Sequence, residues 1–432
     1  MSLALFTILL TPTADAFCGT YVGGAGDLYN SASRVAMARF GDQTTITMAN
    51  DVQGDTSDFA VVVPVPEIPG PDDVNVIDPE VFERLDGYSE PRLVSYECDD
   101  FFGDQYDADS SGGGDDGGEE DTGSVVDVEA RYIVGEYEIV ILSATESGAL
   151  VEWLQASGYA VADASAALLQ EYIDGGSYFF AAKVGPDAEI ESGDTLSPLQ
   201  FSYESETWAL PVRLGTLNSP GEQDLIIYAA NAFEDGEAGI ANYTEAVIED
   251  GCLWQPEGDE PFTEFYADRL SSAHGETGAN WVVEYSWGEM HCDPCTGVTP
   301  DTSDMVALGV SQDDVDTGNL WFTRLHLRYA PEDVNAPLAL YHSDITTTRQ
   351  QRYIQHEGWL QEFFEVCDQG WVEPVDACEE SEYYDDASDA EELDWSGGDD
   401  TKGCGGCATS GAAPAAGLLL MGALGLARRR RA

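Results

Sequence analysis

The most reactive side chains of this 432-residue chain lie in one short run, His291-Cys292-Asp-Pro-Cys295. The run follows an apolar, strand-like segment, and a C-x-P-C motif in that position is typical of thiol redox sites. Three interpretations are open: a structural disulfide, a redox pair or the beginning of a zinc site. We favour the disulfide, because the residues after Cys295 are poor helix formers and no second pair of metal ligands follows.

Three basic residues alternate along another strand-like segment, Arg324-Leu-His326-Leu-Arg328. Side chains alternate between the two faces of a strand, so both arginines and the histidine share one face. One interpretation is a binding site for an anion or a carboxylate ligand. The other, which we favour, is that these residues pair with carboxylates of the chain itself.

An acidic segment resembles the beginning of a calcium-binding loop. Asp107, Asp109 and Ser111 stand at the first three ligand positions, and Gly112 stands where the turn requires glycine. The twelfth position of such a loop is a bidentate glutamate, but Gly118 occupies it here. We therefore expect weak, collective binding of Ca²⁺ by a disordered acidic loop, and no other cofactor.

Charge sets limits on the partners. The chain has 82 acidic and 17 basic residues, and its net charge is -65. Such a surface repels backbone phosphates, so we expect no nucleic-acid partner, whereas cations are suitable ligands. The sequence also contains no G-x-S-x-G, H-E-x-x-H or P-loop motif. We therefore expect that the protein is not an enzyme.

The elements that must position these residues are mostly strands. Apolar and alternating runs are separated by turn residues such as Gly41-Asp42, and they show no regular alternation of strand and helix. This order favours an α+β fold, with a β-rich body of mixed, mainly antiparallel sheets, a few amphipathic helices and disulfide clips. Strands are predicted at 34–40, 44–49, 59–65, 137–142, 177–184, 201–203, 207–214, 225–230, 281–287, 320–329 and 338–341, and helices at 78–85, 147–156 and 163–173.

Changes in composition divide the chain into six segments. A signal peptide, two parts of a folded body, a disordered insertion, a self-repelling stalk and a tail follow one another. Their predicted bounds are 1–16 for the signal peptide, 17–98 for the β-rich N-terminal part, 99–123 for the acidic Gly-rich insertion, 124–378 for the main α+β part, 379–403 for the acidic stalk and 404–432 for the sorting tail.

The cysteine count indicates disulfides. Nine cysteines minus the two in the tail leave seven in the body, and exported proteins use such cysteines as covalent links. Possible pairs are Cys367 with Cys378, Cys18 with Cys98, and Cys292 with Cys295 or with Cys252. The connectivity stays open. The seven candidates are Cys18, Cys98, Cys252, Cys292, Cys295, Cys367 and Cys378.

Both ends of the chain carry targeting features. The apolar run 3–10 is followed by Ala14-Asp15-Ala16, which is typical of a signal-peptide cleavage site. At the other end, the apolar run 411–427 precedes four arginines, Arg428 to Arg431. This run is shorter than the about 20 residues that span a bilayer. The arginines favour a cytoplasmic end, so we expect an exported protein that is associated with the membrane through its C-terminus.

The tail, with Cys404 and Cys407 before its apolar run, resembles the C-terminal sorting signals of myxobacterial surface proteins, named MYXO-CTERM. The resemblance implies that export and sorting machinery removes the helix and the arginines and that the mature protein is displayed on the cell surface. It also implies that Cys407, or else Cys404, is the site of processing or lipid attachment. The alternative is an uncleaved transmembrane anchor.

The body resembles the "domain of unknown function 2330" family of exported bacterial proteins over about residues 17 to 360. The family has no assigned reaction, so the resemblance implies no catalytic residues. Six runs in order carry it: Phe17-Cys-Gly, Asp58-Phe-Ala-Val-Val-Val-Pro-Val-Pro66, Leu196-Ser-Pro-Leu-Gln-Phe201, Leu210-Pro-Val-Arg-Leu-Gly-Thr-Leu-Asn-Ser219, Cys292-Asp-Pro-Cys-Thr296 and Thr323-Arg-Leu-His-Leu-Arg-Tyr329.

Two functional hypotheses result. The first is a non-enzymatic protein of the cell envelope or outer surface that serves in envelope structure, adhesion, or ligand or cation binding. The second is an exported thiol-disulfide oxidoreductase or metal-dependent enzyme that uses the motif His291 to Cys295.

Overall fold

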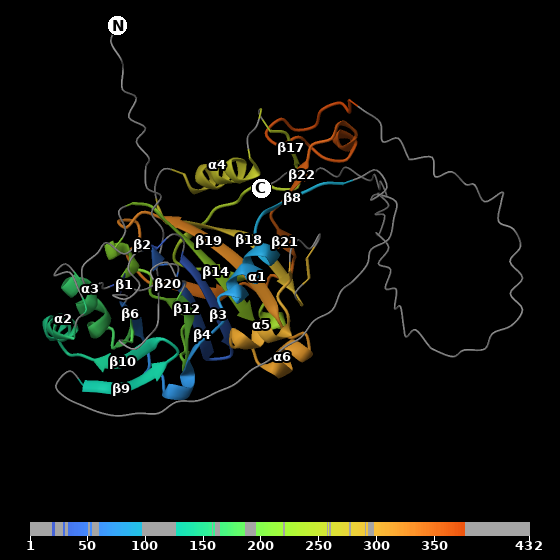
Figure 1. Cartoon of the computed structure of the whole chain (residues 1–432). Coiled ribbons are helices and arrows are strands. Elements are labelled where there is room, and N and C mark those ends of the chain that lie inside the picture. The colour runs from blue at the N-terminus through green and yellow to red at the C-terminus, as the bar shows by residue number, and fades with distance from the viewer. Residues whose placement is uncertain are drawn as a thin grey trace, which may run out of the picture. The chain divides into compact units, whose positions relative to one another are not determined.

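The fold is described from a computed structural model of the chain, which divides into two compact units, Met1–Glu380 and Ser381–Ala432 (Figure 1). All described residues belong to the first unit. The predicted signal peptide, acidic insertion, stalk and sorting tail lie outside them. The described residues are 20–21, 29–30, 33–50, 52–53, 60–96, 127–157, 159, 165–185, 196–218, 221–256, 258, 261–275, 278–289, 291–292 and 298–375.

A nine-stranded sheet forms the centre of the first unit. Its neighbouring strands are antiparallel, except that β14 pairs with β3 and β16 pairs with β18 in parallel. The strand order is β16 (Thr244–Glu245), β18 (Asn280–Gly288), β19 (Trp321–Tyr329), β14 (Gln223–Asn231), β3 (Ser33–Phe40), β4 (Gln43–Asn50), β12 (Leu196–Glu204) and β7 (Val74–Val76), and β21 (Arg349–Gln350) also pairs with β18.

A five-stranded sheet packs against one face of the nine-stranded sheet. Its strand β6 contains the apolar run 59–65, and Val61, Val62, Val63 and Val65 are each at most 1 % exposed. The strand is therefore buried on both faces. The order is β1 (Thr20–Tyr21), β6 (Ala60–Val65), β11 (Tyr178–Val184), β10 (Tyr137–Ser143) and β9 (Asp127–Val134).

Smaller sheets and the helices complete the unit. Three sheets hold β13 (Ala209–Leu210), β20 (Leu338–His342) and β15 (Ala238–Ile240); β17 (Leu253–Trp254), β22 (Arg352–Gln355) and β8 (Arg92–Val94); and β2 (Tyr29–Asn30) with β5 (Val52–Gln53). The helices are α1 (Glu80–Ser89), α2 (Ser147–Ala156), α3 (Ser165–Asp174), α4 (Phe262–His274), α5 (Thr302–Ala307) and α6 (Gln312–Asp316), with short 3-10 turns at Pro71–Asp73, Gly215–Asn218, Phe233–Asp235 and Gly358–Glu362.

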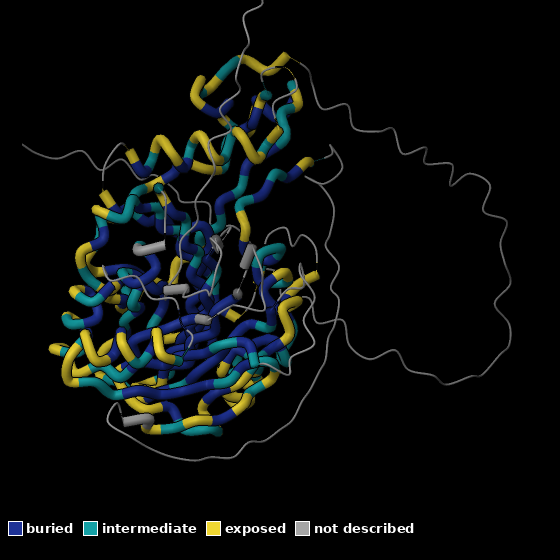
Figure 2. Tube along the Cα trace, turned by 60° about the vertical axis from the view of Figure 1, so that its left-hand side comes forward, coloured by how far each residue is buried: buried dark blue, intermediate teal, exposed yellow. Residues whose placement is uncertain are grey.

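The core has four layers. Successive residues of a buried strand face opposite ways, so each large sheet contacts one layer on each of its faces. In β11, Phe180 and Ala182 face the nine-stranded sheet, whereas Phe179 and Ala181 face α2 and α3. The nine-stranded sheet in turn packs its other face against α1 and α5. Figure 2 shows the buried strands inside and exposed turns of helix outside. The order of layers is helix, sheet, sheet, helix.

The predicted fold class is confirmed, since the structure is α+β with mostly antiparallel sheets. The helix predicted at 78–85 exists as α1, but it begins later, at Glu80, and continues to Ser89. At its start, the carboxylate of Asp78 accepts a hydrogen bond of 2.9 Å from the backbone N–H of Glu80. The strand predicted at 207–214 is too long, because the structure forms only β13, Ala209–Leu210. The observed strand ends after Leu210, since Pro211 has no backbone N–H to continue the hydrogen bonds of the sheet. Helix α4 was not predicted.

One disulfide joins Cys252 to Cys367, with 5.1 Å between their Cα atoms. The pairs Cys367–Cys378 and Cys252–Cys292 suggested by the sequence are therefore wrong. Nearness along the chain was misleading, because the sheet places Leu253 beside Val366 and so brings two distant segments together. Cys292 is also disulfide-bonded, and its partner lies outside the described residues, as do Cys18, Cys98, Cys295 and Cys378.

Replacing both Cys252 and Cys367 with serine should lower the free energy of unfolding by about 2 to 5 kcal/mol, because the link closes a long loop in the unfolded chain. Guanidinium unfolding followed by tryptophan fluorescence measures the change, with Trp254 in the same cluster as Cys367 as a reporter. The single variant Cys378→Ser is the control and should keep the bridge. Peptide mapping that finds Cys367 joined to Cys378 would contradict the pairing.

Candidate functional site

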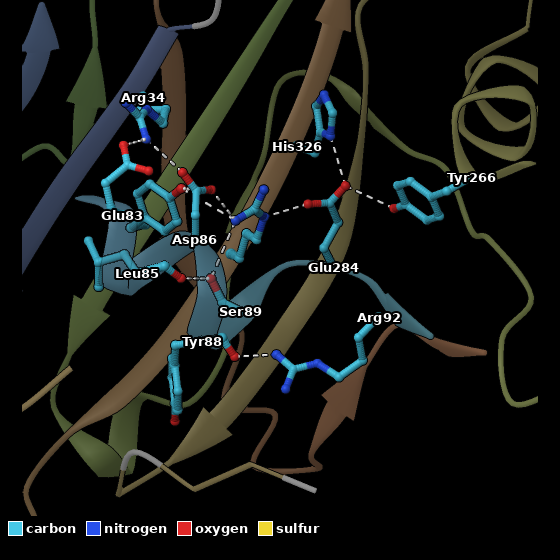
Figure 3. A network of polar contacts seen from close by, with 12 residues as sticks. Arg34, Glu83, Leu85, Asp86, Tyr88, Ser89, Arg92, Tyr266, Glu284 and His326 are labelled. Atoms are coloured by element: carbon cyan, nitrogen blue, oxygen red, sulfur yellow. Dashed lines mark hydrogen bonds and ion pairs between the residues drawn. The ribbon is translucent and has the colours of Figure 1, made fainter. Parts of the chain in front are cut away.

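The predicted basic face lies on β19, in the nine-stranded sheet. Leu325 and Leu327 point into the core between the two large sheets, so the residues that alternate with them point the other way, toward α1 and α4. Arg324, His326 and Arg328 thus share one face, as their spacing predicts. They lie within a network of buried and partly buried ion pairs. Figure 3 shows the part of this network around Asp86, Glu284 and His326.

Arg324 is the centre of this network, and its side chain is only 6 % exposed. Its Nε donates to Glu284 Oε2 at 2.5 Å, and its Nη1 donates to Asp86 Oδ1 at 2.7 Å. Glu284 comes from the neighbouring strand β18, whereas Asp86 comes from α1, so one guanidinium joins the helix to the sheet. The guanidinium carbon also lies 5.4 Å from the ring centre of Tyr228, within cation–π range.

His326 lies between two carboxylates. Its Nδ1 is 2.7 Å from Glu284 Oε1, and its Nε2 is 3.0 Å from Asp224 Oδ1. Burial favours the neutral ring, but Glu284 and Asp224 outweigh it and raise the pKa of His326 to about 9. The ring is therefore a cation that donates from both nitrogens at neutral pH.

The two carboxylates stay ionised. Burial alone would raise the pKa of Glu284, but the charges of His326 and Arg324 lower it to about 2. Burial also opposes ionisation of Asp224, but hydrogen bonds from His326 and Arg328 hold its pKa well below the ordinary value. Arg328 binds Asp224 with both Nε and Nη2, at 2.8 and 2.7 Å. Tyr266 of α4 donates to Glu284 at 2.8 Å.

The network continues onto α1. Asp86 also accepts hydrogen bonds from the hydroxyl of Tyr228 and, at 2.8 Å, from Nη1 of Arg34 on β3. Arg34 further contacts Glu83 at 3.0 Å. Although burial raises the pKa of Asp86, Arg324 and these hydrogen bonds outweigh it and lower that pKa. Helix α1 is thus held to the sheet by charges as well as by its apolar face.

A second histidine lies close to this network but stays neutral. His274, at the end of α4, is 5 % exposed, and its ring centre is 6.4 Å from that of His326. Burial and the positive charges of His326 and Arg328 lower the pKa of His274 to about 4. Its ring nitrogens have no hydrogen-bond partner among the described residues. At neutral pH, therefore, His326 is positively charged and His274 is neutral.

The His291-Cys292 motif lies at the far end of α1. The hydroxyls of Tyr88 on α1 and Tyr285 on β18 are 2.5 Å apart, and both donate to the carbonyl of His291. The side chain of His291 is exposed, and Cys292 packs partly against the cluster under α1. The motif is therefore anchored through its backbone, while Cys295 lies outside the described residues.

The positive and negative charges of the described network balance each other. Protonated His326 and the three arginines of the network carry as many positive charges as Glu83, Asp86, Asp224 and Glu284 carry negative ones. An anionic ligand would have to displace an internal carboxylate from a buried position. Of the two interpretations of Arg324, His326 and Arg328, pairing with the chain's own carboxylates describes this geometry.

Other predicted site residues lie elsewhere. Asp107, Asp109 and Ser111, and Cys404 and Cys407, are outside the described residues. Within the described part of the chain, no group of three or more His, Cys, Asp or Glu side chains is arranged to hold a metal ion. A search of the same residues found no helix with the length and apolar character needed to cross a membrane.

None of the four carboxylates of the network was singled out from the sequence. Glu284 had a detectable signal, because it is a lone charge within the apolar run from Trp281 to Trp287. A carboxylate in a buried strand requires a cationic partner. Asp86 and Asp224 had no such signal, since each is one of many acidic residues in polar surroundings.

The fold and the site define a class of protein. It is an α+β protein with stacked, mainly antiparallel sheets, and its buried charges form ion pairs with one another. The chain belongs to the family described as "uncharacterized protein conserved in bacteria" (DUF2330), which matches residues 12–340. The resemblance inferred from six sequence runs is thus confirmed. The match ends before Cys367, so the disulfide falls partly outside it. No curated protein and no solved structure matches the chain.

Replacing Arg324 with methionine should lower the free energy of unfolding by about 3 to 5 kcal/mol, because Asp86 and Glu284 would keep buried charges without their shared partner. Urea unfolding measures the loss. Arg131→Met is the matched control, because Arg131 is half-exposed and 3.7 Å from Glu138, and such a pair contributes about 0 to 1 kcal/mol. Equal losses in the two variants would show that the network does not stabilise the fold.

Stability should also depend on pH through His326. Because its pKa is raised from about 6.5 when unfolded to about 9 when folded, its contribution is complete below pH 6.5 and is lost as the pH rises through 9. Wild-type protein should lose on the order of 2 to 3 kcal/mol between pH 6.5 and 9.5. His326→Gln should lose much less, whereas His356→Gln, outside the network, should behave like wild type. Parallel pH profiles for all three proteins would exclude this role.

Proposed function

We propose that the protein is exported and displayed on the outer surface of the cell, where it acts without catalysing a reaction. In this proposal it is held at the envelope through its C-terminal tail or through a modified Cys407 or Cys404. Its role there is in envelope structure, adhesion, or the binding of a ligand or cations.

One observation carries the non-enzymatic part of the proposal. The ionisable side chains predicted as a possible ligand site, Arg324, His326 and Arg328, are bonded to internal carboxylates at 2.5 to 3.0 Å. Catalytic acids and bases must instead exchange protons with a substrate, which requires access and a pKa near the working pH. A histidine with a pKa of about 9 between two carboxylates is a structural cation.

Two further features support export. The bond between Cys252 and Cys367 suits an oxidising compartment outside the cytoplasm. The net charge of -65 keeps a displayed protein soluble and favours contact with cations. Both features agree with the targeting patterns at the two ends of the sequence. In this proposal, those patterns direct export and attachment to the cell envelope.

A second candidate is favoured by the bonded state of Cys292. This cysteine takes part in a disulfide and is only partly buried, next to the exposed side chain of His291. A disulfide in such a position is open to attack by an external thiolate. A thiol-disulfide oxidoreductase that uses His291, Cys292 and Cys295 is therefore the alternative to the non-enzymatic role.

Cells treated with an external protease should lose the protein, because the body is exposed at the surface. Replacing Arg428 to Arg431 with glutamines should impair display, whereas four lysines should preserve it, since positive charge retains the tail end in the cytoplasm. Immunoblots of shaved cells measure both effects, with a cytoplasmic protein as the control for lysis. A protected cytoplasmic pool of the unaltered protein would refute surface display.

A further inference from the structure

A cavity of about 380 Å³ lies where the two large sheets meet. Residues of β4 and β12 from the nine-stranded sheet and of β6 from the five-stranded sheet form its floor. These floor residues are apolar or aromatic and are at most 7 % exposed. They are Ile46, Met48, Val63, Val65, Phe201 and Tyr203.

The mouth of the cavity is polar but electrically balanced. Glu171 at the end of α3 and Arg213 are the charged side chains among the described lining residues, and they form an ion pair with each other. Ser205 and Thr207 add neutral hydroxyls, 3.2 Å apart, on the same rim. The mouth therefore offers hydrogen bonds without a free charge.

The cavity has the properties of a binding pocket. Protein interiors are packed as densely as organic crystals, so a space of this size between two sheets is not filled by ordinary packing. Its volume is within the range of small-molecule sites, which are mostly apolar with a few polar groups at defined positions. The ring of Phe201 stacks with that of Tyr203, with 6.2 Å between their centres, so two aromatic rings lie side by side in the lining.

We propose that this cavity binds a small, uncharged, single-chain apolar molecule whose hydrocarbon chain lies on the floor and whose neutral polar end meets the hydroxyls of the rim. A charged end is disfavoured because the charged side chains of the rim, Glu171 and Arg213, are already paired with each other. An anion is further opposed by the net charge of -65. This inference rests on the ligand-binding role in the proposed function and names the chemical class of the ligand.

The test uses the exported chain purified with its disulfides intact, and 1-decanol as the probe. Nile red in the cavity reports binding by fluorescence, and 1-decanol should displace it. Decanoate, which has the same length but a carboxylate, should bind at least tenfold more weakly. Saturating 1-decanol should also raise the melting temperature, because a ligand that binds the folded state stabilises it.

Two variants fill the cavity from two lining segments. Ala336→Trp, from the loop before β20, and Thr207→Trp, from the exposed rim before β13, should each weaken 1-decanol binding at least tenfold. Ala330→Trp is the matched control, because Ala330 is also partly buried but does not line the cavity, and it should bind like wild type. Circular dichroism and melting curves verify that each variant is folded.

The proposal is overturned if wild-type protein does not bind 1-decanol, if decanoate binds equally well, or if neither folded cavity variant weakens binding. These outcomes leave surface display intact, because protease shaving tests it separately. The alcohol should also be recovered chemically unchanged after incubation. A modified alcohol would instead overturn the non-enzymatic role while the cavity still binds it.

Discussion

The fold depends on one buried guanidinium. Arginine cannot release its proton in a protein, so Arg324 at 6 % exposure must be met by carboxylates. It meets Asp86 on α1 and Glu284 on β18, which are far apart in the sequence. Each carboxylate is in turn bonded to another cation, Arg34 or His326. The first helix is thereby joined to strands from the last third of the described chain, and loss of one member would leave others charged and unpaired.

This constraint separates the two faces of the nine-stranded sheet. One face carries Leu325, Leu327 and their neighbours into the apolar core shared with the five-stranded sheet. The other carries the ion pairs beneath α1 and α4. Burying charges is costly, so their presence ties specific elements together more than it adds net stability. Space for a small molecule remains on the apolar side, where the two sheets meet and no internal charge is required.

The same constraint decides between the two interpretations of the basic residues. In a chain with 82 acidic residues, pairing with internal carboxylates was the favoured interpretation, and a ligand site was the alternative. Once paired, those cations are unavailable, and the cavity lined by Met48, Phe201 and Val65 is better suited to bind a ligand. In our proposal, the extreme charge serves solubility and cation contact at the surface, and a ligand is bound in the apolar cavity between the two large sheets.

The sequence by itself determined the local elements and which residues share a face. Apolar runs indicated strands such as β6 and β14, and the two-residue period of a strand placed Arg324, His326 and Arg328 on one face. Only the tertiary structure decided their partners. Asp86 is 238 residues from Arg324, and Cys252 joins a cysteine 115 residues away. Sheet order brings such residues together, and because it results from non-local pairing, no local pattern among so many similar carboxylates encodes it.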